Sequence, residues 1–180
     1  GRLVGSEMCI RDSLRTIAGL EKLKKGSIIL NGKTLSSENI NLEPEERNVS
    51  LAFQDNSLFP HYTIEKNISL GSERNKEKKE KKISLKEIVD LLDIFHILNK
   101  YPHEISAGEA QRASLARSLI MQPDLLLLDE PLSNVDQSFK EEIQVRLKKI
   151  LNKLKITTTI IVTHDSYEAF YLGSKCGIIL

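Results

Sequence analysis

The stretch LLLLDEP, residues 125–131, runs four leucines directly into two acidic residues and a proline. An apolar run without alternation is typical of a strand that helices cover on both faces. A second such run, Ile160–Val162, leads through one threonine to His164, and a third predicted strand over 49–53 leads to Gln54. Because helical patterns separate these strands, the sequence predicts an α/β fold with a parallel sheet.

The segments around the predicted strands show helix and turn patterns. The predicted elements are the end of a helix over 14–23 with a stop at Gly26, a hairpin turning at Asn31–Gly32, and helices over 85–98, 109–121 and 139–154. The run GSERNKEKKEKK, residues 71–82, carries too much charge to bury a face. This composition favours a solvated loop or frayed helix over a basic binding patch.

The composition is that of one ordinary globular domain. The chain has 180 residues, and its 26 basic side chains nearly balance 25 acidic ones, so the charge gives no indication of nucleic-acid binding. Cys9 and Cys176 are far apart and outside any C-x-x-C spacing, so the sequence suggests neither a disulfide framework nor a zinc site and fits a reducing compartment. No apolar run reaches the ~18 residues that span a bilayer.

Three predicted strands end on polar residues, at the edge where ligands bind in parallel sheets. Asp129 carries the carboxylate oxygens that Mg²⁺ prefers, and Glu130 can deprotonate a water that attacks a phosphoryl group. His164 can support that phosphate. The alternative for D-E-P is a simple helix-initiating cluster, since acids and proline are favoured there. The leucine run and the strand-terminal histidine favour phosphoryl transfer.

At this point a family resemblance appears. The segment YPHEISAGEAQRASLARSLIMQPDLLLLDEPLSNVD, residues 101–136, resembles the signature-helix-to-D-loop segment of ABC transporter ATP-binding subunits. IIVTHDSYEAFYL, residues 160–172, is also similar, with His164 as the switch histidine. The resemblance covers about 14–180 and implies a P-loop NTPase-like ABC ATPase core with a parallel sheet and a helical signature subdomain at about 71–121.

The resemblance implies a role for each motif. LLLLDE is similar to the Walker B strand, with Asp129 toward magnesium and Glu130 as the catalytic base. Gln54 is similar to the Q-loop glutamine, which touches the metal and the attacking water and leads into the surface that meets the membrane permease. The segment 133–136 is similar to the D-loop, which brings Asp136 to the nucleotide.

The segment ISAGE, residues 105–109, is similar to the LSGGQ signature. The resemblance implies that Ser106 and Gly108 face the γ-phosphate of an ATP held by a partner subunit, where backbone N–H groups and a hydroxyl bind it. Ala107 replaces a glycine, and its methyl group can block a positive φ. Glu109 replaces glutamine and adds negative charge. Because acids are favoured at a helix start, the sequence favours both as tolerated variants.

The phosphate-binding loop of the family, G-x-x-x-x-G-K-[ST], has no match in the sequence. Gly26–Thr34 comes nearest, but it has five residues between its glycines, and these are strand formers typical of a hairpin. Counting back from the first predicted helix, the lysine falls at Ile10 and the preceding glycine at Cys9. Arg11 and Asp12 then take the hydroxyl positions, so none matches.

Residues 1–13, GRLVGSEMCIRDS, therefore look foreign to the fold. We interpret them as a non-native junction, such as translated sequencing adapter. Residues 14–180 then form a partial ABC ATPase domain that is incomplete at both ends, since 176–180 begins a strand and stops.

Two functions stay open. The first is the ATP-hydrolysing, energy-coupling subunit of an ABC importer for a small solute or ion, and SLFPHYTIEKNI, residues 57–68, resembles the branch for ferric iron and polyamines. It implies ATP and Mg²⁺, a second nucleotide-binding subunit in a homodimer, membrane permease subunits and indirectly a solute-binding protein, with no nucleic acid. It also implies a peripheral place on the cytoplasmic face of the membrane.

The second function is a catalytically inactive or non-transport ABC-type interaction module, which the missing phosphate loop favours. Glu130, Gln54 and His164 favour the first function. In either case the chain as it stands is predicted to bind nucleotide poorly. The other histidines, His61, His96 and His103, show no ligand spacing and are predicted to be surface or structural residues.

Overall fold

The computed structural model describes residues 3–53, 57–73, 83–154 and 158–177, apart from the side chains of 3–9, 72 and 73. The described α-helices are α1 (Leu3–Ala18), α2 (Ile64–Glu73), α3 (Leu85–Leu91), α4 (Ala107–Ile120), α5 (Gln137–Leu154) and α6 (Ser166–Leu172). The strands are β1 (Ile28–Leu30), β2 (Lys33–Ser36), β3 (Val49–Ala52), β4 (Leu125–Asp129) and β5 (Thr158–Val162). Short 3₁₀ turns lie at Pro44–Glu46, Phe95–Ile97 and Pro102–Glu104.

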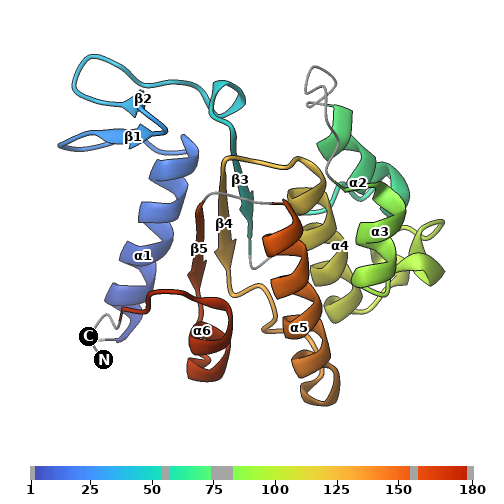
Figure 1. Cartoon of the computed structure of the whole chain (residues 1–180). Coiled ribbons are helices and arrows are strands. Elements are labelled where there is room, and N and C mark those ends of the chain that lie inside the picture. Colours follow the sequence, from blue (N-terminus) through green and yellow to red (C-terminus); the bar gives the residue numbers. More distant parts are fainter. Residues whose placement is uncertain (1–2, 54–56, 74–82, 155–157, 178–180) are drawn as a thin grey trace.

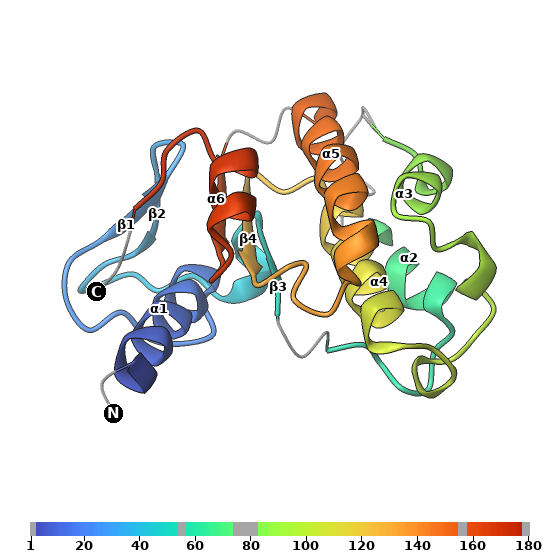
Figure 2. The ribbon, with the colours of Figure 1, turned by 90° about the horizontal axis from the view of Figure 1, so that it is seen from below.

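The strands β3, β4 and β5 form a parallel sheet in that order, which confirms the predicted α/β fold. Every residue of the central strand β4 is buried, as expected for an apolar strand covered on both faces. Figure 1 shows the sheet between α1 on one side and α4 and α5 on the other. Figure 2, from below, shows the same layers, with α2 and α3 outside α4.

Alternate leucines of β4 belong to two separate cores. Leu125 and Leu127 pack with Leu14 of α1 and Leu35 of the hairpin. Leu126 and Leu128 face the larger cluster, which includes buried residues of α2, α3, α4 and α5. Because successive strand residues point to opposite faces, this one strand ties both layers together.

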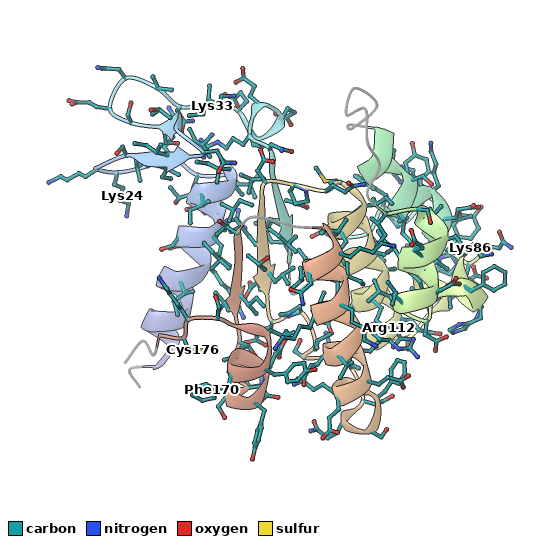
Figure 3. The ribbon with its side chains drawn as sticks, in the orientation of Figure 1. Lys24, Lys33, Lys86, Arg112, Phe170 and Cys176 are labelled. Atoms are coloured by element: carbon teal, nitrogen blue, oxygen red, sulfur yellow. The ribbon has the colours of Figure 1, made fainter. Side chains whose placement is uncertain are left out.

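The hairpin of β1 and β2 forms where the sequence predicts it. Asn31 and Gly32 both have positive φ, 51° and 79°, as a two-residue turn of this kind requires. Figure 3 shows the side chain of Lys24 pointing outward at this end of the molecule and Phe170 pointing outward from α6, whereas Lys33 Nζ donates to the carbonyl of Glu46 at 3.3 Å.

Arg47 joins α1 to the hairpin. Its side chain is 2% exposed and donates to the carbonyls of Thr16 and Ile17, both at 3.0 Å, and to the Ser36 hydroxyl at 2.8 Å. Gly19 ends α1 with a φ of 88°, and a Cβ there would lie 2.6 Å from Arg47 Nε. The close approach of this buried arginine therefore requires glycine at the helix end.

The first predicted helix has different bounds. The predicted helix end extends to Leu23, whereas α1 runs from Leu3 and ends at Ala18, because Gly19 takes a left-handed conformation. The residues interpreted as foreign are thus helical from Leu3 onward and continuous with the rest of α1.

The predicted helix over 85–98 is also wrong in its second half. α3 ends at Leu91, and Asp93 has a φ of 50°, which a helix cannot continue. Phe95, which lies at helical spacing from Leu91 and Leu92, is 73% exposed, and Ile94 and Ile97 are buried instead.

The helical layer begins earlier than the sequence suggested, at Ile64 rather than at about 71. Most of the charged run over 71–82 lies outside the described residues. Among the helices that the structure describes, none combines the length and apolar character needed to cross a membrane.

Replacement of Leu126 tests the role of β4. Leu126→Ala should lower the free energy of unfolding by about 2–5 kcal/mol, because it leaves a cavity where the side chain is fully buried. Val145→Ala, at a position on α5 that is 38% exposed, should change it by less than about 0.5 kcal/mol. Urea unfolding measures both, and equal losses would contradict this account of the core.

Candidate active site

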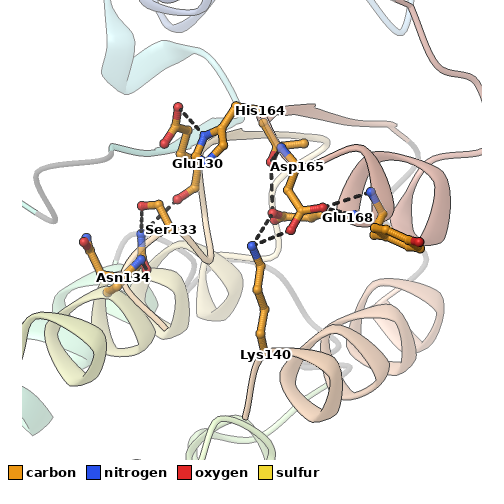
Figure 4. A network of polar contacts seen from close by, with 10 residues as sticks. Glu130, Ser133, Asn134, Lys140, His164, Asp165 and Glu168 are labelled. Carbon is orange, nitrogen blue, oxygen red and sulfur yellow. Dashed lines mark hydrogen bonds and ion pairs between the residues drawn. The ribbon is translucent and has the colours of Figure 1, made fainter. Parts of the chain in front are cut away.

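The pairing of β4 with β5 brings three of the predicted site residues to one edge of the sheet. Asp129 lies opposite Val162, and the Glu130 amide donates to the Val162 carbonyl at 2.8 Å. Two residues later the chain reaches His164, whose Nδ1 lies 3.2 Å from Glu130 Oε1. The structure therefore places the second acid of LLLLDEP in contact with the strand-terminal histidine, as Figure 4 shows.

Glu130 has an unusual backbone. Its φ is 48°, and its carbonyl accepts a 2.8 Å hydrogen bond from Nε2 of Gln111. A non-glycine residue in the left-handed region stores strain, which is common where a side chain must be aimed at a reacting group. Only 13% of the Glu130 side chain is exposed, so the carboxylate is largely shielded from solvent.

Arg11 contacts both acids from α1. Its Nε lies 3.2 Å from Asp129 Oδ2, and its Nη2 lies 3.9 Å from Glu130 Oε1. The buried Asp129 carboxylate suits Mg²⁺ by its chemistry, but the Arg11 guanidinium already pairs with its Oδ2. With α1 continuous over this region and no glycine-rich loop in the sequence, the residues present do not fit magnesium-bound triphosphate.

The signature segment forms the start of α4. Ser106 is its N-cap: its Oγ accepts from the Glu109 amide at 3.2 Å, while its own amide and hydroxyl donate to Glu109 Oε2, both at 2.8 Å. His96 Nε2 lies 2.8 Å from the other oxygen of Glu109. Burial alone would raise the pKa of Glu109, but the hydrogen bonds from Ser106 and His96 lower it from 4.5 to about 2. Glu109 therefore acts here as a capping residue.

The neighbouring signature positions have structural explanations. Ala107 is the first residue of α4 and does not have a positive φ, so the helix accommodates its methyl group without backbone strain. At Gly108, a Cβ would lie 2.7 Å from the carbonyl oxygen of Asn134. The D-loop backbone therefore packs directly on this glycine.

Gln111 is a site residue that the sequence reasoning missed. It is 3% exposed, and its Nε2 donates to the Glu130 carbonyl at 2.8 Å and to the Ser133 hydroxyl at 3.1 Å. Its Oε1 accepts from the Asn134 amide at 2.9 Å. One amide side chain thus joins the signature helix, the end of β4 and the D-loop.

The remaining predicted residues lie in varied places. Asp136 is exposed, and its carbonyl accepts from the Phe139 and Lys140 amides at the start of α5. Gln54 lies outside the described residues. The other three histidines, His61, His96 and His103, are exposed. His96 also pairs with Glu109.

Asn67 holds the loop that follows position 54. Its fully buried side chain donates to the carbonyls of Phe59, Tyr62 and Thr63 at 3.0–3.1 Å, and its Oδ1 accepts from the Phe59 amide at 2.7 Å. Arg117 lies over the Phe59 ring, 5.7 Å from its centroid. The exposed aromatic residues of this loop are therefore fixed from beneath.

Comparison with known proteins gives a family match over residues 13–133, to the ABC transporter family. The chain is 36% identical to the Fe(3+) ions import ATP-binding protein FbpC of Fusobacterium nucleatum, over 98% of this chain and 47% of that protein. It is 44% identical to the molybdate/tungstate import ATP-binding protein WtpC of Methanocaldococcus jannaschii, over 93% of this chain and 54% of that protein. The chain thus spans about half the length of these relatives.

Solved structures confirm the fold. A dimeric ATP-binding cassette in a post-hydrolysis state with ADP and Pi matches with a TM-score of 0.74 and 24% identity, over 90% of this chain and 72% of that chain. A second dimeric cassette structure matches with a TM-score of 0.70.

Glu109 should make stability depend on acid. Glu109→Ala should lower the free energy of unfolding at pH 7 by about 1 kcal/mol, the usual value of a lost cap. A carboxyl group whose pKa is lowered in the folded state stabilises the fold fully only at pH values above its ordinary pKa. The difference in unfolding free energy between the original chain and Glu109→Ala should therefore shrink as pH falls from 4.5 towards about 2.

The measurement is urea unfolding at pH 7, 4 and 3. Glu109→Gln is the control, because glutamine keeps the capping box without the titrating group. Its loss relative to the original chain should be smaller but should shrink over the same pH range, so the difference between the Gln and Ala variants should not vary with pH. A constant gap for Glu109→Ala across this range would contradict the assigned role.

Asn67 should control the order of the loop over 57–63. Asn67→Ala leaves buried backbone groups without their partner and should cost roughly 1–3 kcal/mol. Chymotrypsin should then cut after Tyr62 faster under native conditions. Asn99→Ala, at an exposed position, is the matched control, and equal cleavage in both variants would refute the assignment.

Proposed function

The chain belongs to the ABC transporter family, and on that premise we propose that it is part of the ATP-hydrolysing, energy-coupling subunit of an importer. The observation that carries the proposal is the Glu130–His164 contact of 3.2 Å at the common edge of β4 and β5. A carboxylate beside an imidazole at such an edge suits proton transfer from an attacking water.

Glu130 is the residue we propose as general base. Its low exposure and its backbone bonds to Val162 and Gln111 hold the carboxylate in place, so little reorganisation is needed when it takes a proton. His164 is 68% exposed and uses Nδ1 toward Glu130, which leaves Nε2 to face the reacting group. Asp129 is the proposed magnesium ligand in a subunit whose phosphate loop is present.

The proposed partners follow from the relatives and from the surface. FbpC, WtpC and further relatives at 34–35% identity are import ATP-binding proteins, and their names cover iron, molybdate or tungstate, glycerol phosphate and sugars. We therefore propose a small solute or ion as cargo, with ferric iron or a polyamine as the specific assignment. A second nucleotide-binding subunit would face Ser106, Gly108 and Asp136. Permease subunits would dock near Gln54 at the cytoplasmic face of the membrane, and a solute-binding protein would act through them.

A second function has its own observation. The contacts of Arg11 with Asp129 and Glu130 neutralise the two acids from within the chain. This favours a catalytically inactive interaction module for the chain as it stands.

One experiment separates the two functions. In a chimera, residues 1–12 are replaced by a strand and a G-x-x-x-x-G-K-[ST] loop leading into Ser13. The chimera should hydrolyse ATP in a magnesium-dependent way, and Glu130→Gln should lower kcat by at least ~100-fold, the usual contribution of a general base. Glu141→Gln, at an exposed position of α5, should leave the rate unchanged.

The original chain should fail to bind radiolabelled ATP at micromolar concentration in equilibrium dialysis. A folded chimera without hydrolysis would favour the interaction module, and full activity of the Glu130→Gln chimera would refute the proposed base.

A further inference from the structure

Lys140 is a buried cation on α5. The residue is 8% exposed, and its Nζ lies 2.7 Å from Asp165 Oδ2 and 3.7 Å from Glu168 Oε2. Lysine is almost never buried without partners, because removing its charge from water is costly. Figure 4 shows the side chain reaching from α5 to Asp165 at the start of α6. Lys140 does not touch Glu130 or His164 in this view, but its partner Asp165 directly follows His164 in the sequence.

Asp165 connects this cation to the histidine. It directly follows His164 and is the N-cap of α6, with Oδ1 accepting from the amides of Tyr167 at 2.9 Å and Glu168 at 3.2 Å. Its own amide donates to the hydroxyl of Thr163 at 3.1 Å. The residues on both sides of His164 are thus fixed, and the cation holds the carboxylate that fixes them.

The electrostatics agree with this arrangement. The hydrogen bond from Lys140 lowers the pKa of Asp165. Burial raises the pKa of Glu168, which is 1% exposed and accepts from the Thr163 hydroxyl at 3.0 Å. The cation thus holds Asp165 as a carboxylate beside a second, buried acid.

Lys140 also belongs to the segment that follows the D-loop. Its amide donates to the carbonyl of Asp136 at 2.9 Å, within the first turn of α5. A displacement of the D-loop would therefore move the start of α5 and with it the anchor of Asp165.

We propose that Lys140 is a positioning residue for His164, and that its ion pair with Asp165 keeps the imidazole of His164 at Glu130. The inference deepens the proposed function, since it assigns a residue outside the recognised motifs to the same site. The competing view is that Lys140 only joins α5 to α6.

The test uses the 180-residue chain with ¹³C-labelled histidine and follows the Cε1–Hε1 signals by NMR. The His164 signal is the one lost in His164→Gln, and Glu130→Gln shows where it lies when the carboxylate partner is missing. Lys140→Met, which keeps the length of the side chain without its charge, should move the His164 signal toward its position in Glu130→Gln. Lys140→Arg should restore the original position.

Lys148→Met is the matched control. Lys148 also joins α5 to α6, since its Nζ donates to the Tyr171 carbonyl at 2.6 Å, but it does so at the far end of α6. It should leave the His164 signal in place. An unmoved signal in folded Lys140→Met, or an equal movement in Lys148→Met, would overturn the proposal.

A second variant covers the case in which Lys140→Met does not fold. Asp165→Asn keeps an N-cap oxygen and removes the negative charge, so it should move the signal in the same direction. An unmoved signal in Asp165→Asn overturns the proposal. Because the measurement needs no nucleotide, a moved signal together with an inactive chimera would leave the positioning role and remove the proposed function.

Discussion

The site depends on the register between β4 and β5. Asp129 lies opposite Val162, the last residue of β5, and the Glu130 amide donates to the Val162 carbonyl. Glu130 therefore lies beside the segment that leads from β5 to His164. A slip of one residue would send Leu126 and Leu128 to the wrong core and would separate the acid from the imidazole. The burial of four consecutive leucines on two faces therefore sets the chemical geometry as well as the stability.

Buried polar groups attach α4 and the D-loop to this edge of the sheet. Gln111 satisfies its buried amide only when α4, the end of β4 and the D-loop are assembled together. Gly108 permits that assembly, because the Asn134 carbonyl occupies the space of a side chain. A buried polar network costs free energy if one member is displaced, so it favours a single arrangement of the three segments.

The sequence predicted the features that depend on the spacing of apolar residues and on the shared direction of parallel strands. The apolar strands, the hairpin at Asn31–Gly32 and the sheet edge with Glu130 and His164 followed from short-range patterns. It could not predict Gln111, Arg47 or Lys140, because a polar residue on a helix or in a loop looks solvated until the opposite element is known. Phe95 shows the converse: helical spacing continued through Asp93, where the backbone turns left-handed and ends α3.

The N-terminal helix explains why an intact fold does not settle catalysis. Phosphate loops place the free N–H groups of a helix start at the phosphates. Here α1 starts at Leu3, so its free amides lie roughly two turns before Arg11, away from the acids. Adjacent, largely buried carboxylates at Asp129 and Glu130 still need a counter-charge, and the Arg11 guanidinium supplies it. The pair of acids is thus neutralised by a cation from within the chain, and the proposed catalytic role requires that an external cation take the place of Arg11.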